Sequence, residues 1–329
     1  MCRAAACRIV GVMEQLTAVA PAAGRSAGVP AIAARGLRKR FGDVEAVAGL
    51  DLEVARGEVF GLVGPNGAGK TTTLEMIEGL RRPDDGTIEI LGQPVWPHPQ
   101  AVQARIGVQL QTTALFDELT AGELLALFER FYGPGRPHRV AAALETVGLS
   151  AKRDAHVKTL SGGQQQRLAI ALALVHEPEV VFLDEPTTGL DPQARRQLWD
   201  VVRAICAEGR TVLLTTHYME EAEALCQRVA IVDAGRIIAL DTPQGLVRGI
   251  GAHSRVRFRG EDLDLGALRA LPGVEAARTW EDGVELVCLH PRVTLAALLD
   301  TPADVHELAV LRPTLEDVFL EHTGREYRS

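Results

Sequence analysis

The chain has 329 residues, which is long for one ordinary domain and favours two. Hydrophobic residues make up 47% and charged residues 24%, as in globular proteins that bury a sizeable core. The net charge of −8 is spread without long basic or acidic runs, which argues against a nucleic-acid-binding surface, so no nucleic-acid partner is expected.

Cysteine usage and hydropathy further limit the class of protein to which the chain can belong. The five cysteines are an odd number without CxxC spacing, which predicts reduced thiols rather than a disulfide framework or a zinc site. No stretch approaches the roughly 20 continuous apolar residues of a membrane-spanning helix. An Ala-rich run near the N-terminus resembles an export signal, but Arg8, Glu14 and Gln15 interrupt it. We expect a disordered tail over residues 1–28, with Met13 as an alternative start.

The first predicted secondary structure is rich in strands. Regular structure is expected from about Ala31, and Val44–Val54 is one β-prone segment. The apolar run Val59–Val63 predicts a buried strand, and a glycine-rich turn connects it to a helix from about Lys70 to Glu78. This order of strand, turn and helix is the context that a phosphate-binding loop requires.

The turn itself matches the phosphate-binding pattern GxxxxGK[ST]. Glycines let successive backbone N–H groups curl around phosphates, and the helix N-terminus adds partial positive charge. Lys70 is expected to reach the β- and γ-phosphates of ATP, and the Thr71 hydroxyl to ligate Mg²⁺. The predicted nucleotide-contacting residues are Gly64, Pro65, Asn66, Gly67, Ala68, Gly69, Lys70, Thr71 and Thr72. A chance match in a glycine-rich loop is the alternative, and kinases, GTPases and motors also carry such loops.

A strand and several helices are predicted next. Pro83–Gly86 is typical of a turn, and Thr87–Leu91 of a strand. Apolar residues at spacings of three and four predict helices between Leu115 and Gly148, interrupted by a loop at Gly133–Pro137. A further helix is predicted over Gln164–His176, because a proline follows it.

The residues that lead into this helix, Leu160-Ser161-Gly162-Gly163-Gln164, form a second anion-binding pattern. A serine hydroxyl and glycine N–H groups at the mouth of a helix can hold phosphate oxygens. Ordinary helix caps have the same composition, so the pentapeptide alone leaves a purely capping role equally open. Ser161, Gly162, Gly163 and Gln164 are predicted to contact nucleotide.

Two adjacent acids end the next predicted strand. The run Val180–Leu183 is apolar and β-branched, as in strands buried on both faces of a parallel sheet, and Asp184 and Glu185 follow it. Asp184 can hold the water shell of Mg²⁺, and Glu185 can orient or deprotonate an attacking water. The alternative is a pair of solvated acids at a strand end.

The rest of the chain predicts a helix, three strands and then a second α+β region. A helix from about Pro192 to Glu208 precedes strand Thr211–Thr215, and Arg228–Asp233 with Arg236–Asp241 predicts a hairpin. A short helix over Pro243–Gly251 is expected to close the first domain. Strands and helices then alternate over Val256–Arg259, Leu263–Leu271, Val274–Thr279, Val284–Leu289, Thr294–Leu299, His306–Leu311 and Leu315–His322.

Taken in order, these motifs resemble those of ATP-binding cassette (ABC) ATPases over residues 31–250. The resemblance implies an α/β P-loop fold with a RecA-like core, an antiparallel β subdomain and a helical subdomain, plus a small C-terminal α+β domain. The expected division is a tail over residues 1–28, a nucleotide-binding domain over residues 29–251 and an accessory domain over residues 252–329.

The resemblance also implies roles for residues outside the two loops. Asp191 corresponds to the D-loop residue at the nucleotide, and His217 to the switch histidine, which acts in catalysis with Glu185. Gln111 corresponds to the catalytic, Mg²⁺-binding glutamine of the Q-loop, although Gln109 is close enough to compete. Phe41 lies where the family places an aromatic ring on adenine, and a core phenylalanine at a strand end is the alternative.

The implied machine is a dimer on a membrane. The phosphate-binding loop of one copy and the signature of a second copy would sandwich each ATP, which gives two composite sites. A single cassette without membrane helices implies a separate transmembrane permease, with the chain cytoplasmic and peripheral on the inner face of the cell membrane. The predicted docking segment follows Gln111 and includes Phe116, Leu119 and Glu123.

The C-terminal tail narrows the resemblance. Pro313–Leu320, with Thr323-Gly324-Arg325, looks like the end of ATPase subunits from bacterial drug and antibiotic-resistance exporters, such as those for daunorubicin-type compounds. The predicted function is therefore ATP hydrolysis that powers export of a drug or other small lipophilic compound. A helix that docks the small domain would give the same tail. The rival is a soluble ABC ATPase of the ribosome or of DNA repair, and a P-loop phosphotransferase would have no use for the signature.

Overall fold

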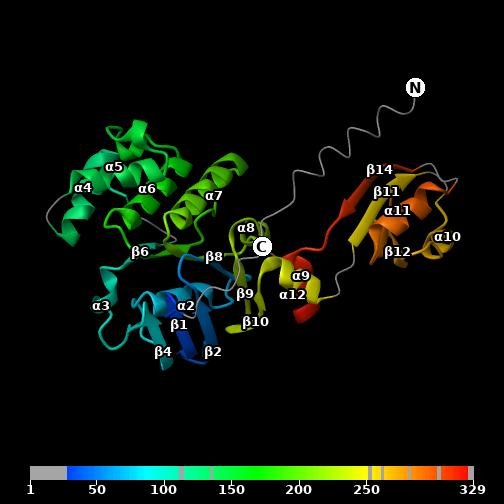
Figure 1. Ribbon diagram of the computed structural model, residues 1–329, viewed down its shortest axis with the longest axis horizontal. Helices are drawn as coiled ribbons and strands as arrows, with labels where there is room; N and C mark the ends of the chain where they lie inside the picture. The colour runs from blue at the N-terminus through cyan, green and yellow to red at the C-terminus, as the bar shows by residue number, and fades with distance from the viewer. Residues whose placement is uncertain are drawn as a thin grey trace.

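The computed structural model describes residues 28–110, 115–133, 136–250, 254–260, 263–280, 283–301 and 305–324. Met13 and all but the last residue of the predicted tail lie outside this part of the chain, and so does Gln111. The strands of the described residues form three sheets (Figure 1).

A six-stranded sheet forms the centre of the nucleotide-binding part. Its strands follow the order β10-β9-β3-β8-β7-β6 and run parallel except for the edge strand β10. Their bounds are Val59–Val63 (β3), Ile106–Gln109 (β6), Val180–Asp184 (β7), Thr211–Thr216 (β8), Arg228–Asp233 (β9) and Arg236–Asp241 (β10). Every residue of β3 and β7 is buried, which explains their uninterrupted apolar sequences.

Alternate residues of the central strands face two different cores. Phe60 and Phe182 pack with helix α2 (Lys70–Ile77) and an antiparallel sheet, whereas Val63 and Leu183 pack with the other helices. The antiparallel sheet has the order β2-β1-β4-β5, with bounds Ile32–Phe41 (β1), Val44–Val54 (β2), Asp85–Ile90 (β4) and Gln93–Pro94 (β5). The central sheet therefore lies between an antiparallel sheet and a helical layer, which confirms the predicted fold class.

Capping residues decide where two helices of the helical layer begin. The first starts at Ala121 rather than near Leu115, because Thr120 and Glu123 form a capping box. Another starts two residues earlier than predicted because Ser161 is its N-cap. The helices are Gln100–Gln103 (α3), Ala121–Glu129 (α4), Pro137–Thr146 (α5), Gly162–Leu174 (α6), Pro192–Ala207 (α7), Met219–Leu225 (α8) and Pro243–Gly249 (α9). No helix among the described residues is long and apolar enough to cross a bilayer.

A third sheet occupies the C-terminal region. Its antiparallel order is β12-β13-β11-β14, and two helices accompany it. The bounds are Ser254–Gly260 (β11), Leu265–Arg269 (α10), Val274–Trp280 (β12), Gly283–Cys288 (β13), Pro291–Leu299 (α11) and Val305–Leu311 (β14). Val256, Phe258 and Leu286 belong to a separate hydrophobic core, as the alternating strand and helix pattern suggests.

The last helix, α12 (Leu315–Thr323), leaves this region and returns to the nucleotide-binding part. Leu315, Val318 and Phe319 form its apolar stripe and are buried in the core of the helical layer, against α8 and α9. Figure 1 shows α12 beside α9, away from the third sheet. The apolar stripe of α12 therefore completes the larger core, and the predicted accessory domain over residues 252–329 stays a prediction.

Candidate nucleotide site

The phosphate-binding loop connects the end of β3 to α2, as predicted. A Cβ atom on Gly64 would lie 2.1 Å from the Val232 carbonyl oxygen, and one on Gly69 would lie 2.3 Å from the Ala46 carbonyl oxygen. Gly69 also has a φ of 98°, in the left-handed region that side chains disfavour. Both positions therefore require glycine, because a side chain there would collide with a backbone carbonyl oxygen of a neighbouring segment.

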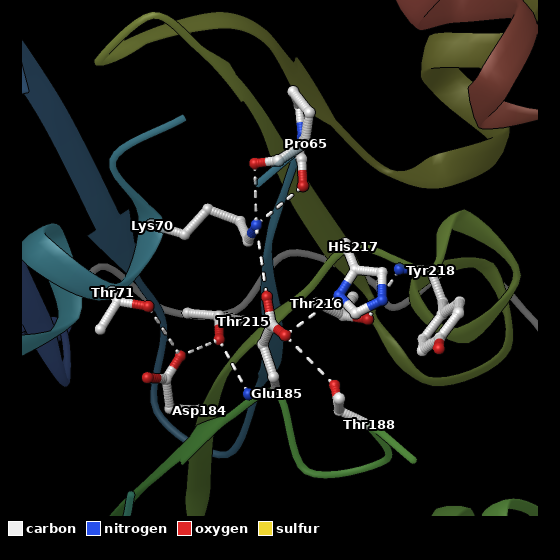
Figure 2. A network of polar contacts seen from close by, with 11 residues as sticks. Pro65, Lys70, Thr71, Asp184, Glu185, Thr188, Thr215, Thr216, His217 and Tyr218 are labelled. Carbon is white, nitrogen blue, oxygen red and sulfur yellow. Dashed lines mark hydrogen bonds and ion pairs between the residues drawn. The ribbon is translucent and has the colours of Figure 1, made fainter. Parts of the chain in front are cut away.

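Lys70 occupies the centre of the site with its charge directed at the loop. Its Nζ donates to the carbonyl oxygens of Gly64 at 2.8 Å and Pro65 at 3.0 Å, and lies 3.5 Å from Glu185 Oε1 (Figure 2). Burial lowers the pKa of Lys70, and the neighbouring carboxylate of Glu185 opposes that shift. The ammonium group is thus held near its anionic partner in a site with little water.

Asp184, the last residue of β7, forms an oxygen cluster with two hydroxyls. Thr215 Oγ1 donates to its Oδ1 at 2.5 Å, and Thr71 Oγ1 lies 3.3 Å from the same atom (Figure 2). Burial raises the pKa of Asp184, while the hydrogen bonds from Thr215 and Thr71 lower it. Hard oxygen atoms of this kind are the ligands that Mg²⁺ prefers.

Glu185 follows Asp184 in the chain but has different partners. Its Oε2 lies 3.0 Å from His217 Nδ1 and accepts a hydrogen bond from Thr188 Oγ1 at 3.1 Å (Figure 2). Its φ is 46°, in the left-handed region, and Thr215 Oγ1 accepts its backbone N–H at 3.0 Å. Such strain concentrates at functional sites, where surrounding bonds hold it in place. Two of the three predicted catalytic residues, Glu185 and His217, therefore meet in one contact.

The signature residues lie on the surface. Ser161 is the N-cap of α6, and its Oγ accepts the N–H of Gln164 at 3.4 Å while the Gln164 side chain accepts the N–H of Ser161 at 3.0 Å. Gly163 lies against Ala194, and Asp191 accepts the Ala194 N–H at 2.8 Å as the N-cap of α7. The structure brings signature and D-loop together, and Ser161, Gly162 and Asp191 are exposed. Gly163 and Gln164 are half-buried, whereas Lys70, Asp184 and Glu185 are buried. The capping role left open by the sequence is present and does not exclude a ligand.

The aromatic and glutamine predictions have different outcomes. Phe41 ends β1 with 43% of its surface exposed, so it is not a core residue, and the Arg81 guanidinium lies 5.0 Å from its ring centroid. Gln111 lies outside the described residues, so its role stays a prediction. Gln109 is buried at the end of β6, and its Nε2 donates to the Leu110 carbonyl oxygen at 2.5 Å.

Four residues of the site were not predicted from the sequence. Thr215 holds Asp184 and the backbone of Glu185, and Thr188 contacts the Glu185 carboxylate. The Tyr218 ring lies 4.1 Å from that of His217, and Arg81 covers Phe41. One signal was available for Thr215, because a threonine in a buried apolar strand needs a hydrogen-bond partner.

Comparisons with known proteins agree with this geometry. Residues 47–188 match the family described as ABC transporter. The Nod factor export ATP-binding protein I of Ralstonia nicotianae is 42% identical over 308 residues, which cover 91% of the chain and 95% of that protein. The protein of the same name from Burkholderia orbicola is 44% identical and covers 89% of the chain and 96% of its own length. A solved dimer of an ATP-binding cassette in a post-hydrolysis state, bound to ADP and Pi, has a TM-score of 0.58 and 26% identity, and covers 64% of this chain and 98% of its own.

Proposed function

The chain belongs to the ATP-binding proteins of ABC transporters and hydrolyses ATP, and we propose that this hydrolysis drives export of a small lipophilic compound through a separate membrane subunit. The observation that carries the proposal is the extent of the likeness to two proteins named for Nod factor export. It covers 91% and 89% of the chain, against 64% for the solved cassette. The likeness therefore includes much of the chain beyond a bare cassette.

The contacts in the buried site support a separate role for each residue in ATP hydrolysis. Lys70 leaves the loop carbonyls for the β- and γ-phosphates, whose charge replaces that of Glu185. Glu185 orients the attacking water and accepts its proton, and His217 holds the Glu185 carboxylate in that position. Phe41 offers an exposed ring to the adenine base.

Mg²⁺ fits the oxygen cluster of Thr71 and Asp184. The two oxygen atoms are 3.3 Å apart, and among the described residues no group of three or more His, Cys, Asp and Glu side chains is arranged to hold a metal. A magnesium ion that takes few ligands from protein and the rest from phosphates and water matches such a sparse site. When bound, it would neutralise phosphate charge, and Gln111 is the further proposed ligand.

Two copies of the chain are proposed to form each complete site. Ser161 and Asp191 are exposed at helix N-termini, where they can meet a nucleotide held by the partner's loop. The similar solved cassette is itself a dimer bound to ADP and Pi. ATP then joins the copies, and the charge of the products separates them.

The proposed permease docks beside the helical layer, which would place the chain in the cytoplasm on the inner face of the cell membrane. A cavity of about 430 Å³ there is lined by Leu80, Leu110, Phe128 and Tyr132, among others. Phe131 next to it is 74% exposed. Within the predicted docking segment Phe116 is also exposed, whereas Glu123 caps α4. Exposed apolar surface of this kind favours a protein partner over the soluble rival.

A transport assay tests the proposal. The chain is expressed with a candidate membrane subunit, and cells are loaded with Nod factor or with a daunorubicin-type drug. Wild type should lower the cellular content of one of them, and Glu185→Gln should not, because its turnover falls by about 10²- to 10⁴-fold. Equal accumulation of every compound in both strains, with full ATPase activity and no membrane partner, would favour the soluble rival.

A further inference from the structure

The proposed hydrolysis assigns no role to Tyr218, which follows His217 in the chain. The centroid of its ring lies 4.1 Å from the centroid of the His217 ring, and the two ring planes are tilted by 42°. Figure 2 shows the phenol ring beside the imidazole. Aromatic rings at such a distance attract each other beyond the area that they bury. The contact therefore limits the directions in which the imidazole can turn.

The backbone of Tyr218 is itself held in place. Tyr218 is the N-cap residue of α8, and its N–H donates to Thr216 Oγ1 at 2.9 Å (Figure 2). Thr216 is the last residue of the central strand β8 and is 1% exposed, so water has little access to this hydrogen bond. The Tyr218 ring therefore starts from a fixed point at the junction of a buried strand and a helix.

A second side chain covers the Tyr218 ring. The guanidinium carbon of Arg195 lies 4.3 Å from the ring centroid, within the range of cation–π contacts. Arg195 Nε is buried and has no hydrogen-bond partner among the described residues, so contact with the ring offsets part of the cost of its burial. Arg195 belongs to the first turn of α7, where its backbone N–H donates to the Asp191 carbonyl oxygen at 2.9 Å. The Tyr218 ring thus connects the start of α7 to the imidazole of His217.

The orientation of that imidazole decides whether His217 reaches Glu185. The distance between His217 Nδ1 and Glu185 Oε2 is 3.0 Å, and a rotation of the ring would move Nδ1 away from the carboxylate. The outer torsion of a histidine side chain has broad minima, so packing rather than torsional preference has to fix the ring. A displacement of about 1 Å at a catalytic contact can reduce a rate by roughly 10²-fold. The ring that packs on the imidazole is therefore expected to affect turnover.

We propose that Tyr218 is a positioning residue that holds the His217 imidazole against Glu185. Arg195 fixes the Tyr218 ring from the start of α7. The inference rests on the proposed roles of Glu185 and His217 in hydrolysis. It adds two side chains that act on the reaction only through the orientation of one imidazole ring.

The test compares Tyr218→Leu and Tyr218→Phe with the control Arg203→Leu in the full chain. We expect Tyr218→Leu to lower kcat about 3- to 10-fold, because the imidazole loses the ring beside it. KM for ATP should change less than about twofold, because the phosphate-binding loop is unaltered. Tyr218→Phe keeps the ring and should retain kcat. Arg203 is also an arginine of α7, but it is exposed and lies 2.9 Å from Asp200, so Arg203→Leu should retain kcat too.

A double-mutant cycle separates positioning from general destabilisation. In a His217→Ala background, Tyr218→Leu should add less than about a twofold loss, because no imidazole is left to position. If Tyr218→Leu does not fold, Arg195→Leu takes its place and should lower kcat about 2- to 5-fold. Arg195→Lys, which keeps a cation near the ring, should recover most of that loss.

The possible failures of the inference and of the proposed catalytic roles are distinct. Wild-type kcat in folded Tyr218→Leu, or in Arg195→Leu where it takes that place, would overturn the inference alone. An equal loss in Tyr218→Phe, or a fully additive loss with His217→Ala, would do the same. Wild-type kcat in His217→Ala would instead refute the proposed role of His217, and the inference with it.

Discussion

Replacing Ser161 with arginine tests whether each site is shared between two chains. In the structure the Ser161 Oγ···N contact to Gln164 is long at 3.4 Å, and the N–H of Ser161 keeps its own acceptor on the Gln164 side chain. Loss of this cap should therefore cost only about 0.5–1 kcal/mol of stability. The loop around Lys70 is buried elsewhere in the same chain, so ATP affinity of the monomer should stay within about threefold of wild type. ATPase activity should be abolished, because the arginine occupies the place of the partner's phosphates.

Mixing this variant with Lys70→Ala sets an upper limit on the ATPase activity that can be recovered. Random association makes about half of the dimers mixed, and each mixed dimer has one site without either substitution. The mixture can therefore hold at most about a quarter of the wild-type number of intact sites. The ATPase rate is measured against the mixing ratio, and its maximum should fall at equal amounts and not exceed that fraction.

Two results would refute the reasoning. If monomeric Ser161→Arg failed to bind a fluorescent ATP analogue, Ser161 would belong to the site of its own chain. If the mixture recovered no ATPase activity at any mixing ratio, each site would need Lys70 and Ser161 from the same chain.

Three further substitutions have expected outcomes. The pKa of Glu78 is raised to about 8 by burial, so the unfolded chain ionises first and wild-type stability falls as pH rises from about 4.5 to about 8. In thermal unfolding, the free energy of unfolding of Glu78→Gln relative to wild type should rise over that pH window, by on the order of 3–5 kcal/mol at its upper end. An advantage of the variant that does not depend on pH would contradict this. Phe319→Ala should cost about 3–5 kcal/mol in denaturant unfolding, because Phe319 joins α12 to the larger core, and a loss under about 1 kcal/mol would place α12 outside that core. Gly64→Ala should lose ATP binding in calorimetry, since its Cβ would lie 2.1 Å from a carbonyl oxygen, and unchanged affinity would mean that the loop relaxes freely.

Elements with a local signal were predictable. Val59–Val63 and Val180–Leu183 are apolar runs bounded by loops or acids, and their identity as buried strands needs no knowledge of distant residues. The path of α12 was not predictable, because its apolar stripe fits any complementary core and the sequence does not say which. The start of α4 depended on one reciprocal cap between Thr120 and Glu123, which periodicity does not detect.

The residues of the nucleotide site also differ in whether a local sequence signal predicts them. Gly64, Lys70 and Thr71 follow from one contiguous motif, whose spacing alone carries the chemistry. Thr215 acts through contacts with Asp184 and Glu185, which lie about 30 residues earlier in the chain, and hydroxyl groups are too common to mark such pairs. Only the order of the strands brings these groups together.

The register of one strand explains why two adjacent acids have different partners. Val180 and Phe182 of β7 face the core that contains α2, so Asp184, two residues further, points the same way and reaches Thr71 at the start of α2. Asp184 is also paired in register with Thr215 of β8, which supplies the second hydroxyl. Glu185 leaves the strand with a φ of 46° and therefore lies with Lys70 and His217 instead. An added residue in β7 would turn Asp184 away from α2, because side chains alternate along a strand, and the oxygen cluster that suits Mg²⁺ would be lost even though every motif residue remained.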